Sequence, residues 1–187
     1  MRIIAGQFGG RRLVAPKGLA TRPTSDRVRE ALFSILGDIA GRTVLDLYAG
    51  SGALGLEALS RGASFATFVE RARAPVQALR ENIEALGVAA ESVVFATEVR
   101  AAIRALGRKG TRVGLVFADP PYADRDTGAL LTDLAESGLL AAGAIVVLEH
   151  SSKVAPPDPG PAGVLRSTRV YGNTALTFFD YPIPEVT

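Results

Sequence analysis

The sequence predicts an open, doubly wound α/β sheet preceded by a short N-terminal β-hairpin. From residue 43 onward, five strand-like runs alternate with four helix-like segments. The runs are almost continuously apolar, as expected for parallel strands that helices cover on both faces. A glycine-rich segment follows the first run, which is typical of this class. The length of 187 residues suits one main domain at 43–187, with residues 1–42 as a basic extension.

The elements follow from local patterns. The β-prone runs 2–5 and 11–14 flank glycines and predict a hairpin, and Thr24 or Ser25 can cap a helix with apolar residues between 28 and 35. Strands are predicted at 43–48, 65–70, 92–96, 113–118 and 144–149, and helices at 53–60, 72–86, 98–106 and 126–136. Two further strand-like runs, 164–171 and 174–179, are joined by Gly172-Asn173, which is hairpin-turn chemistry.

Composition limits the class of protein. A hydrophobic fraction of 48% and a charged fraction of 21% are those of a soluble globular protein, which we expect to be cytoplasmic. The most apolar stretch, 129–148, is interrupted by Asp133 and Glu136, so we expect no membrane partner. The absence of cysteine excludes disulfides and thiolate chemistry, and with a single histidine it argues against a metal site.

The charge is unevenly distributed along the chain. Residues 1–30 carry a net charge of +5, whereas the remainder carries −3. This asymmetry indicates a polyanion such as RNA facing the N-terminal segment, although a solvated arginine-rich surface would give the same pattern. The candidate RNA contacts are Arg2, Arg11, Arg12, Arg22, Arg27 and Arg29.

The first strand and its glycine turn predict a site for an adenosine-containing cofactor. Gly50, Gly52 and Gly55 follow the strand, and Glu70 ends the next one, where its carboxylate can accept hydrogen bonds from ribose hydroxyls. The same spacing fits a nicotinamide or flavin enzyme, but Asp46 in the strand end and the lack of a second substrate domain favour methyl transfer. The candidate cofactor residues are Asp46, Tyr48, Ala49, Gly50, Ser51, Gly52, Glu70, Arg71, Thr97 and Glu98.

The fourth strand ends in Asp119-Pro120-Pro121-Tyr122, which predicts the catalytic loop. The carboxyl ends of parallel strands share one crevice, so this loop faces the glycine turn. The Asp119 carboxylate and the Pro120 carbonyl can accept both N–H bonds of an exocyclic base amine and favour its nucleophilic form. Tyr122 can stack on a base that has left its helix. A proline turn that merely ends a strand is the alternative reading.

With these motifs the chain resembles the bacterial 16S ribosomal RNA guanine-N2 methyltransferases. The resemblance covers nearly the whole chain and includes the segments 2–6, 9–13, 22–24, 27–33, 45–58, 119–122 and 170–174. It implies a class I S-adenosylmethionine-dependent methyltransferase fold with a Rossmann-like, seven-stranded, mostly parallel sheet. It also implies guanine 966 of 16S rRNA as target, within the small subunit or its assembly intermediate, S-adenosylhomocysteine as product, and a monomer.

Two other functions remain open from the sequence. The first is a different amino-methyltransferase, acting on DNA adenine or a protein amide. Enzymes of those kinds tend to carry asparagine where this chain has Asp119, and DNA enzymes usually add a recognition domain. The second is a non-catalytic RNA-binding module, against which the intact glycine turn and the 119–122 loop argue. The resemblance also implies an acidic residue after the third strand that accepts from the adenine amino group, and this position falls on Glu98 here, with the neighbouring Thr97 as the alternative.

Overall fold

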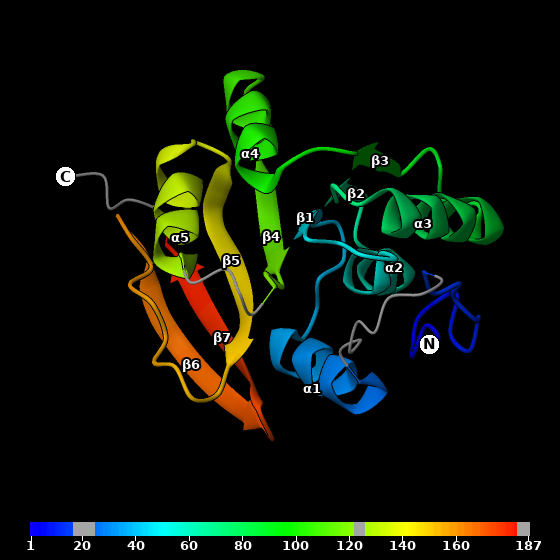
Figure 1. The fold of residues 1–187 in the computed structure, drawn as a ribbon, viewed down its shortest axis with the longest axis horizontal. Helices are drawn as coiled ribbons and strands as arrows, with labels where there is room; N and C mark the ends of the chain where they lie inside the picture. Colours follow the sequence, from blue (N-terminus) through cyan, green and yellow to red (C-terminus); the bar gives the residue numbers. More distant parts are fainter. Residues whose placement is uncertain (17–24, 122–125, 183–187) are drawn as a thin grey trace.

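The computed structural model describes residues 1–16, 25–121 and 126–182. Its centre is a seven-stranded sheet in the order β3-β2-β1-β4-β5-β7-β6 (Figure 1). The strands are β1 (Thr43–Leu47), β2 (Phe65–Val69), β3 (Ser92–Phe95), β4 (Val113–Ala118), β5 (Leu140–Ser151), β6 (Val164–Tyr171) and β7 (Thr174–Tyr181). The first five pair in parallel, and β7 pairs antiparallel with both β5 and β6. The predicted fold class is therefore confirmed.

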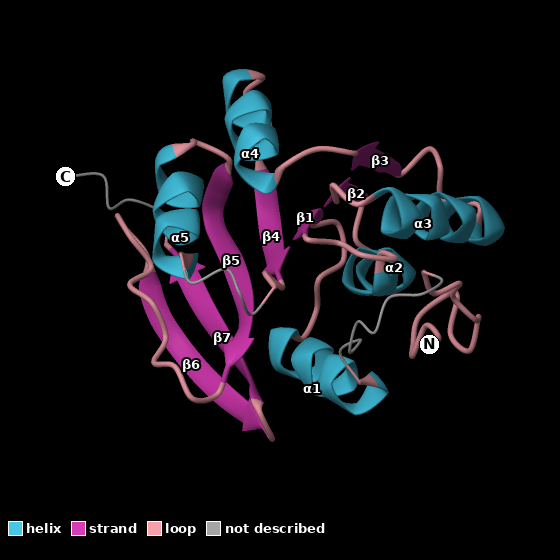
Figure 2. Ribbon diagram, in the orientation of Figure 1, coloured by secondary structure: helices cyan, strands magenta, loops and turns pink. Residues whose placement is uncertain are grey.

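The helices of the described residues flank this sheet (Figure 2). They are α1 (Asp26–Leu36), α2 (Ala53–Ser60), α3 (Arg73–Leu86), α4 (Val99–Arg108) and α5 (Thr127–Glu136). Apolar residues of α1, α2 and α3 pack with one face of the sheet, and those of α4 and α5 form a second cluster on the other. This two-sided covering explains why the strands are almost continuously apolar.

Alternate residues of each strand face one of these two clusters. In β1, Val44 belongs to the cluster of α1–α3, whereas Leu45 and Leu47 belong to that of α4 and α5. Because side chains alternate along a strand, Asp46 points toward the α1–α3 side. Phe117 in β4 and Val147 in β5 are the last residues of their strands in the α1–α3 cluster. By the same alternation, positions 119 and 149 also lie on the α1–α3 side of the sheet.

The N-terminal segment, residues 1–16, contains less regular secondary structure than predicted. Its two arms pair as a hairpin through one antiparallel bridge, Arg2 with Arg12, and through backbone hydrogen bonds from Ile3 N–H to the Arg11 carbonyl and from Leu13 N–H to the Met1 carbonyl, but they do not form two regular strands. The backbone N–H groups of Ile4 and Ala5 donate to the carboxylate of Glu57 on α2, at 2.7 and 3.1 Å, so these amides are not available for a ladder. Ile3 belongs to the same apolar cluster as residues of the sheet, so this cluster spans the predicted boundary at residue 42. The boundary itself stays a prediction.

Most predicted elements agree with the structure to within two residues. β5 is the exception, since it runs over Leu140–Ser151 instead of 144–149. Its pairing with β4 shifts register between Val113 and Leu115, next to Gly143 with φ 73°. Such a bulge lets β5 begin before Gly143, a residue that the sequence pattern leaves outside the predicted strand. Across the described residues, no helix is both long and apolar enough to cross a bilayer.

Candidate active site

The carboxyl ends of the parallel strands open into a cavity of about 640 Å³. This volume is suitable for a ligand of nucleoside size or larger. Nine of the predicted cofactor residues line the cavity: Asp46, Tyr48, Ala49, Gly50, Ser51, Glu70, Arg71, Thr97 and Glu98. Gly52 does not, while Asp119, Pro120 and Pro121 of the predicted catalytic loop do. The structure thus brings both predicted halves to one site; Tyr122 lies outside the described residues.

Asp46 is a buried carboxylate that holds the first turn of α2. Its Oδ2 accepts a hydrogen bond from the Gly55 N–H at 2.9 Å. A Cβ on Gly55 would lie 2.3 Å from the Phe68 ring and 3.1 Å from this oxygen, so the third glycine of the motif permits close packing of helix on strand. Burial raises the pKa of Asp46 to about 7; the negative charge of Glu70 also raises it, and the Gly55 N–H opposes the shift.

The raised pKa of Asp46 predicts a pH-dependent gain from Asp46→Asn. Between about pH 4 and 7 the folded chain retains a proton that the unfolded chain releases, so wild-type stability falls as pH rises through this window. The shift corresponds to at most about 4 kcal/mol. Asparagine keeps an acceptor for Gly55 and does not ionise. We expect the variant to have a higher Tm than wild type at pH 8 and an equal or lower one at pH 5. A Tm difference that is the same at both pH values would contradict this assignment.

Glu70 holds the glycine turn as well as facing the cavity. Its Oε2 accepts from the Gly50 N–H at 3.0 Å, and its Oε1 accepts from the Ala72 N–H at 2.8 Å. Gly50 has φ 56°, a backbone conformation that favours glycine. Each carboxylate oxygen can accept more than one hydrogen bond, so these contacts are compatible with the predicted bonds to ribose hydroxyls.

Arg71 and Glu98 form an exposed ion pair at the rim of the cavity. The Arg71 Nη1 to Glu98 Oε1 distance is 2.9 Å, and both side chains are about two-thirds exposed. The hydrogen bond and charge of Glu98 raise the pKa of Arg71. Thr97 lines the cavity beside this pair. The role of Thr97 or Glu98 in reading an adenine remains a prediction.

Asp119 lies beside a second carboxylate, Glu149, to which the sequence analysis gave no function. The parallel register pairs Ala118 of β4 with Leu148 of β5, so Asp119 and Glu149 are the next positions along adjacent strands. Both line the cavity. Burial raises the pKa of Asp119 well above its ordinary value, with further contributions from the negative charges of Glu149 and then Asp46. The only sequence signal for Glu149 is its place at the end of an apolar run, as for Asp46 and Asp119.

No metal site accompanies these carboxylates in the part of the chain that the structure describes: no three histidine, cysteine, aspartate or glutamate side chains lie close enough together to hold an ion. His150, beside Glu149, has a local role. Its Nε2 lies 2.7 Å from the Thr177 hydroxyl and its Nδ1 lies 3.0 Å from the Ser151 carbonyl oxygen. Burial lowers the pKa of His150. These contacts agree with the structural role that a lone histidine on a strand usually has.

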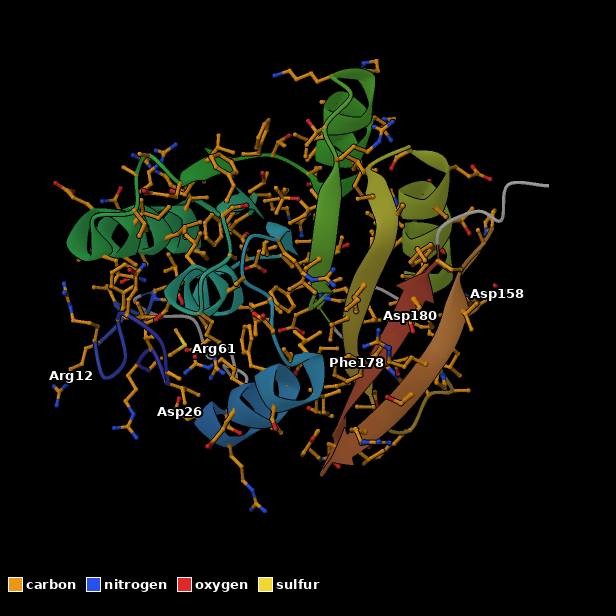
Figure 3. The ribbon with its side chains drawn as sticks, turned by 180° about the vertical axis from the view of Figure 1, so that it is seen from behind. Arg12, Asp26, Arg61, Asp158, Phe178 and Asp180 are labelled. Carbon is orange, nitrogen blue, oxygen red and sulfur yellow. The ribbon has the colours of Figure 1, made fainter. Side chains whose placement is uncertain are left out.

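Most of the candidate RNA-contacting arginines are exposed, but Arg29 is not. Arg2, Arg11, Arg12 and Arg27 lie at the surface, and Arg12 points away from the body of the protein (Figure 3). Arg22 lies outside the described residues. The Arg29 side chain is fully buried, and its Nη2 donates to the Arg2 carbonyl at 2.6 Å and to Asp26 at 2.8 Å. The prediction that Arg29 contacts RNA is therefore wrong, and Arg29 has a structural role instead.

The N-terminal segment is fastened to α2 and α3 by buried polar side chains that sequence analysis did not single out for this role. Besides Glu57, Ser60 accepts from the Phe8 N–H at 3.0 Å and donates to the Ala5 carbonyl at 2.6 Å. Asn82 on α3 accepts from the Val14 N–H at 2.7 Å and donates to the carbonyls of Val14 and Ser51, both at 3.0 Å. Asn82 thus joins the basic segment to the glycine turn of the cavity.

Other residues that line the cavity come from separate parts of the chain. Ser25 and Val28 of the α1 region line it, as do Tyr171 and Thr174 at the turn between β6 and β7. Met1 and Pro16 also reach the cavity, so both ends of the described N-terminal segment border the site.

Comparisons with known proteins agree over nearly the full length of the chain. A family model described as conserved hypothetical protein 95 matches residues 1–180. The chain is 38% identical over 180 residues to ribosomal RNA small subunit methyltransferase D of Escherichia coli K12, covering 96% of this chain and 89% of that protein. The solved structure of the E. coli protein yhhF, assigned as a methyltransferase, matches with a TM-score of 0.87 and 34% identity, covering 97% and 98% of the two chains. A hypothetical protein of Thermus thermophilus matches with a TM-score of 0.81 and 38% identity, covering 95% and 98%.

Proposed function

The chain belongs to the conserved hypothetical protein 95 family, and from this premise we propose that it transfers a methyl group from S-adenosylmethionine to the exocyclic N2 of a guanine in 16S rRNA. The observation that carries the proposal is that the glycine turn, Glu70 and Asp119 line the same cavity. The substrate is the small ribosomal subunit or its assembly intermediate, with guanine 966 as the expected target. The protein acts as a monomer in the cytoplasm.

The cavity suits a positively charged adenosine cofactor. When bound, S-adenosylmethionine supplies an electrophilic methyl group on a cationic sulfur. Asp46, Asp119 and Glu149 place carboxyl groups on one side of the sheet around the cavity, and a cationic ligand would favour their charged forms. Glu70 and the glycine turn are the residues that would hold the adenosine. This acidic surrounding is less favourable for the phosphates of a dinucleotide.

Asp119 and Pro120 provide the acceptors for the target amine. An exocyclic amine donates its lone pair into the ring, so two acceptors that hold its N–H groups out of the ring plane make the nitrogen more nucleophilic. Once methylated, the nitrogen is positively charged and readily loses a proton, which the Asp119 carboxylate already bonded to this amine can accept. The chain thus needs no separate general base.

The experiment that tests the function is methyl transfer to a defined substrate. Small subunits from cells that lack this protein are incubated with the full chain and labelled S-adenosylmethionine, and the rRNA is mapped by mass spectrometry. We expect one N2-methylated guanine in 16S rRNA. Calorimetry with S-adenosylhomocysteine and NAD completes the test. Tight binding of NAD with no response to S-adenosylhomocysteine would overturn the proposal, as would methylation of another amine.

The basic N-terminal segment should supply much of the affinity for RNA. We expect Arg11→Ala with Arg12→Ala to weaken binding to small subunits and to reduce the salt dependence of binding by about one to two counterions. We expect Arg12 to contribute the larger share, because the Arg11 Nη2 already donates to the Ala85 carbonyl at 2.5 Å. Affinity for S-adenosylmethionine should hardly change, since neither arginine lines the cavity.

The measurement is subunit affinity at several salt concentrations. Arg104→Ala with Arg108→Ala is the charge-matched control, because both arginines are exposed on α4, on the opposite face of the sheet from the helices that hold the N-terminal segment. Equal salt slopes for wild type and the Arg11 and Arg12 variant would show that the segment does not neutralise phosphates.

A further inference from the structure

Glu149 and Asp119 form a side-by-side pair of carboxylates at the carboxyl ends of β5 and β4. Their strands pair in parallel with Phe117 opposite Val147 and Ala118 opposite Leu148, so the two acids share the next register position. Residues in register on adjacent strands point to the same face, and their backbones are about 4.8 Å apart. Both line the cavity, and Glu149 is only 9% exposed. A ligand in the cavity therefore meets two carboxylates at neighbouring positions.

Two adjacent buried carboxylates repel one another, and this repulsion is part of what raises the pKa of Asp119. Such a pair is best matched by a ligand that presents two neighbouring hydrogen-bond donors along one edge. With Asp119 on the exocyclic amine, as in the proposed function, the second donor must lie on the atom next to the carbon that carries this amine.

The bases differ at this atom. In guanine the 2-amino group stands next to N1–H, so both groups are donors. In adenine the 6-amino group stands next to an unprotonated N1, and in cytosine the 4-amino group stands next to an unprotonated N3. A carboxylate beside the amine would attract the N1–H of guanine and repel the lone pair of adenine or cytosine. Repulsion of a competitor is as effective for selection as attraction of the correct base.

We propose that Glu149 determines the base specificity of the site, with its carboxylate accepting a hydrogen bond from N1–H of the target guanine while Asp119 accepts from the N2 amine. This inference rests on the proposed function. It assigns to Glu149 the rejection of any base whose amine adjoins an unprotonated ring nitrogen. The rejection is strong because the mismatched base would leave a buried carboxylate facing a lone pair.

The test uses small subunits reconstituted with 16S rRNA that carries guanine, 2,6-diaminopurine or 6-thioguanine at the mapped target. Diaminopurine keeps the 2-amino group but has an unprotonated N1, whereas thioguanine alters C6 and keeps N1–H. For the wild-type chain we expect kcat/KM on diaminopurine to be at least about 100-fold below that on guanine. Thioguanine should be methylated within about tenfold of guanine, because its N1–H is intact.

Glu149→Gln gives the matching change in the protein. Its amide can accept from N1–H or donate to an unprotonated N1, so we expect the guanine-to-diaminopurine ratio to fall to about tenfold or less. Glu30→Gln on the exposed side of α1 is the control and should leave the ratio unchanged. Equal wild-type rates on guanine and diaminopurine would overturn the inference but leave the proposed function standing. A ratio that Glu149→Gln does not change would also overturn it. Failure to methylate any guanine would instead overturn the proposed function.

Discussion

Asp119→Ala is expected to lower kcat for methyl transfer by about 100- to 1,000-fold. Asp119 is assigned to the target amine and makes its strongest interaction as the nitrogen becomes positively charged, so its loss removes stabilisation of the transition state. The affinity for S-adenosylhomocysteine should stay within a few-fold of wild type, because Glu70 and the glycine turn lie on other strands. Single-turnover rates and calorimetry on the same preparations measure the two quantities.

The control for Asp119→Ala is Asp119→Asn, which keeps an acceptor oxygen but cannot take a proton. An intermediate kcat for this variant would separate the acceptor role from the base role. Neither variant should unfold the protein, since removing one of two neighbouring carboxylates relieves repulsion with Glu149. An unchanged kcat, or a protein that fails to bind cofactor, would show that Asp119 is misassigned.

Glu70→Ala is expected to weaken binding of S-adenosylmethionine by about 1–3 kcal/mol, or roughly 5- to 150-fold. Two effects contribute. The variant loses the predicted hydrogen bonds to the ribose, and it leaves the Gly50 and Ala72 N–H groups without the acceptors that shape the turn. Calorimetry with S-adenosylhomocysteine gives the affinity directly.

Glu84→Ala on the exposed side of α3 is the matched control and should bind cofactor as wild type does. Because Glu70 is not assigned to the amine, kcat of Glu70→Ala at saturating cofactor should recover to within about tenfold of wild type. Wild-type affinity in Glu70→Ala would show that the carboxylate has only a structural role in the turn.

The order of the strands and helices could be predicted from the sequence because it depends on local patterns. Continuous apolar runs such as 113–118 and amphipathic segments such as 98–106 are properties of neighbouring residues, and the structure has a strand at Val113–Ala118 and a helix at Val99–Arg108. That the glycine turn and the 119–122 loop face one crevice could also be predicted, because the carboxyl ends of parallel strands lie at the same edge of a sheet. The sequence therefore determined the class of fold and twelve of the 25 residues that line the cavity.

Tertiary structure alone decided which charged residues are buried and which ones meet. Arg29 reads as one more basic residue of a surface segment, yet packing against the chain near Arg2 buries it completely. Glu149 lies 30 positions from Asp119, and only the β4–β5 register places the two carboxylates side by side. Glu57 and Asn82 look like ordinary helix residues until the N-terminal segment folds onto them. Burial and register are set by contacts between distant segments, so local patterns in the sequence do not specify them.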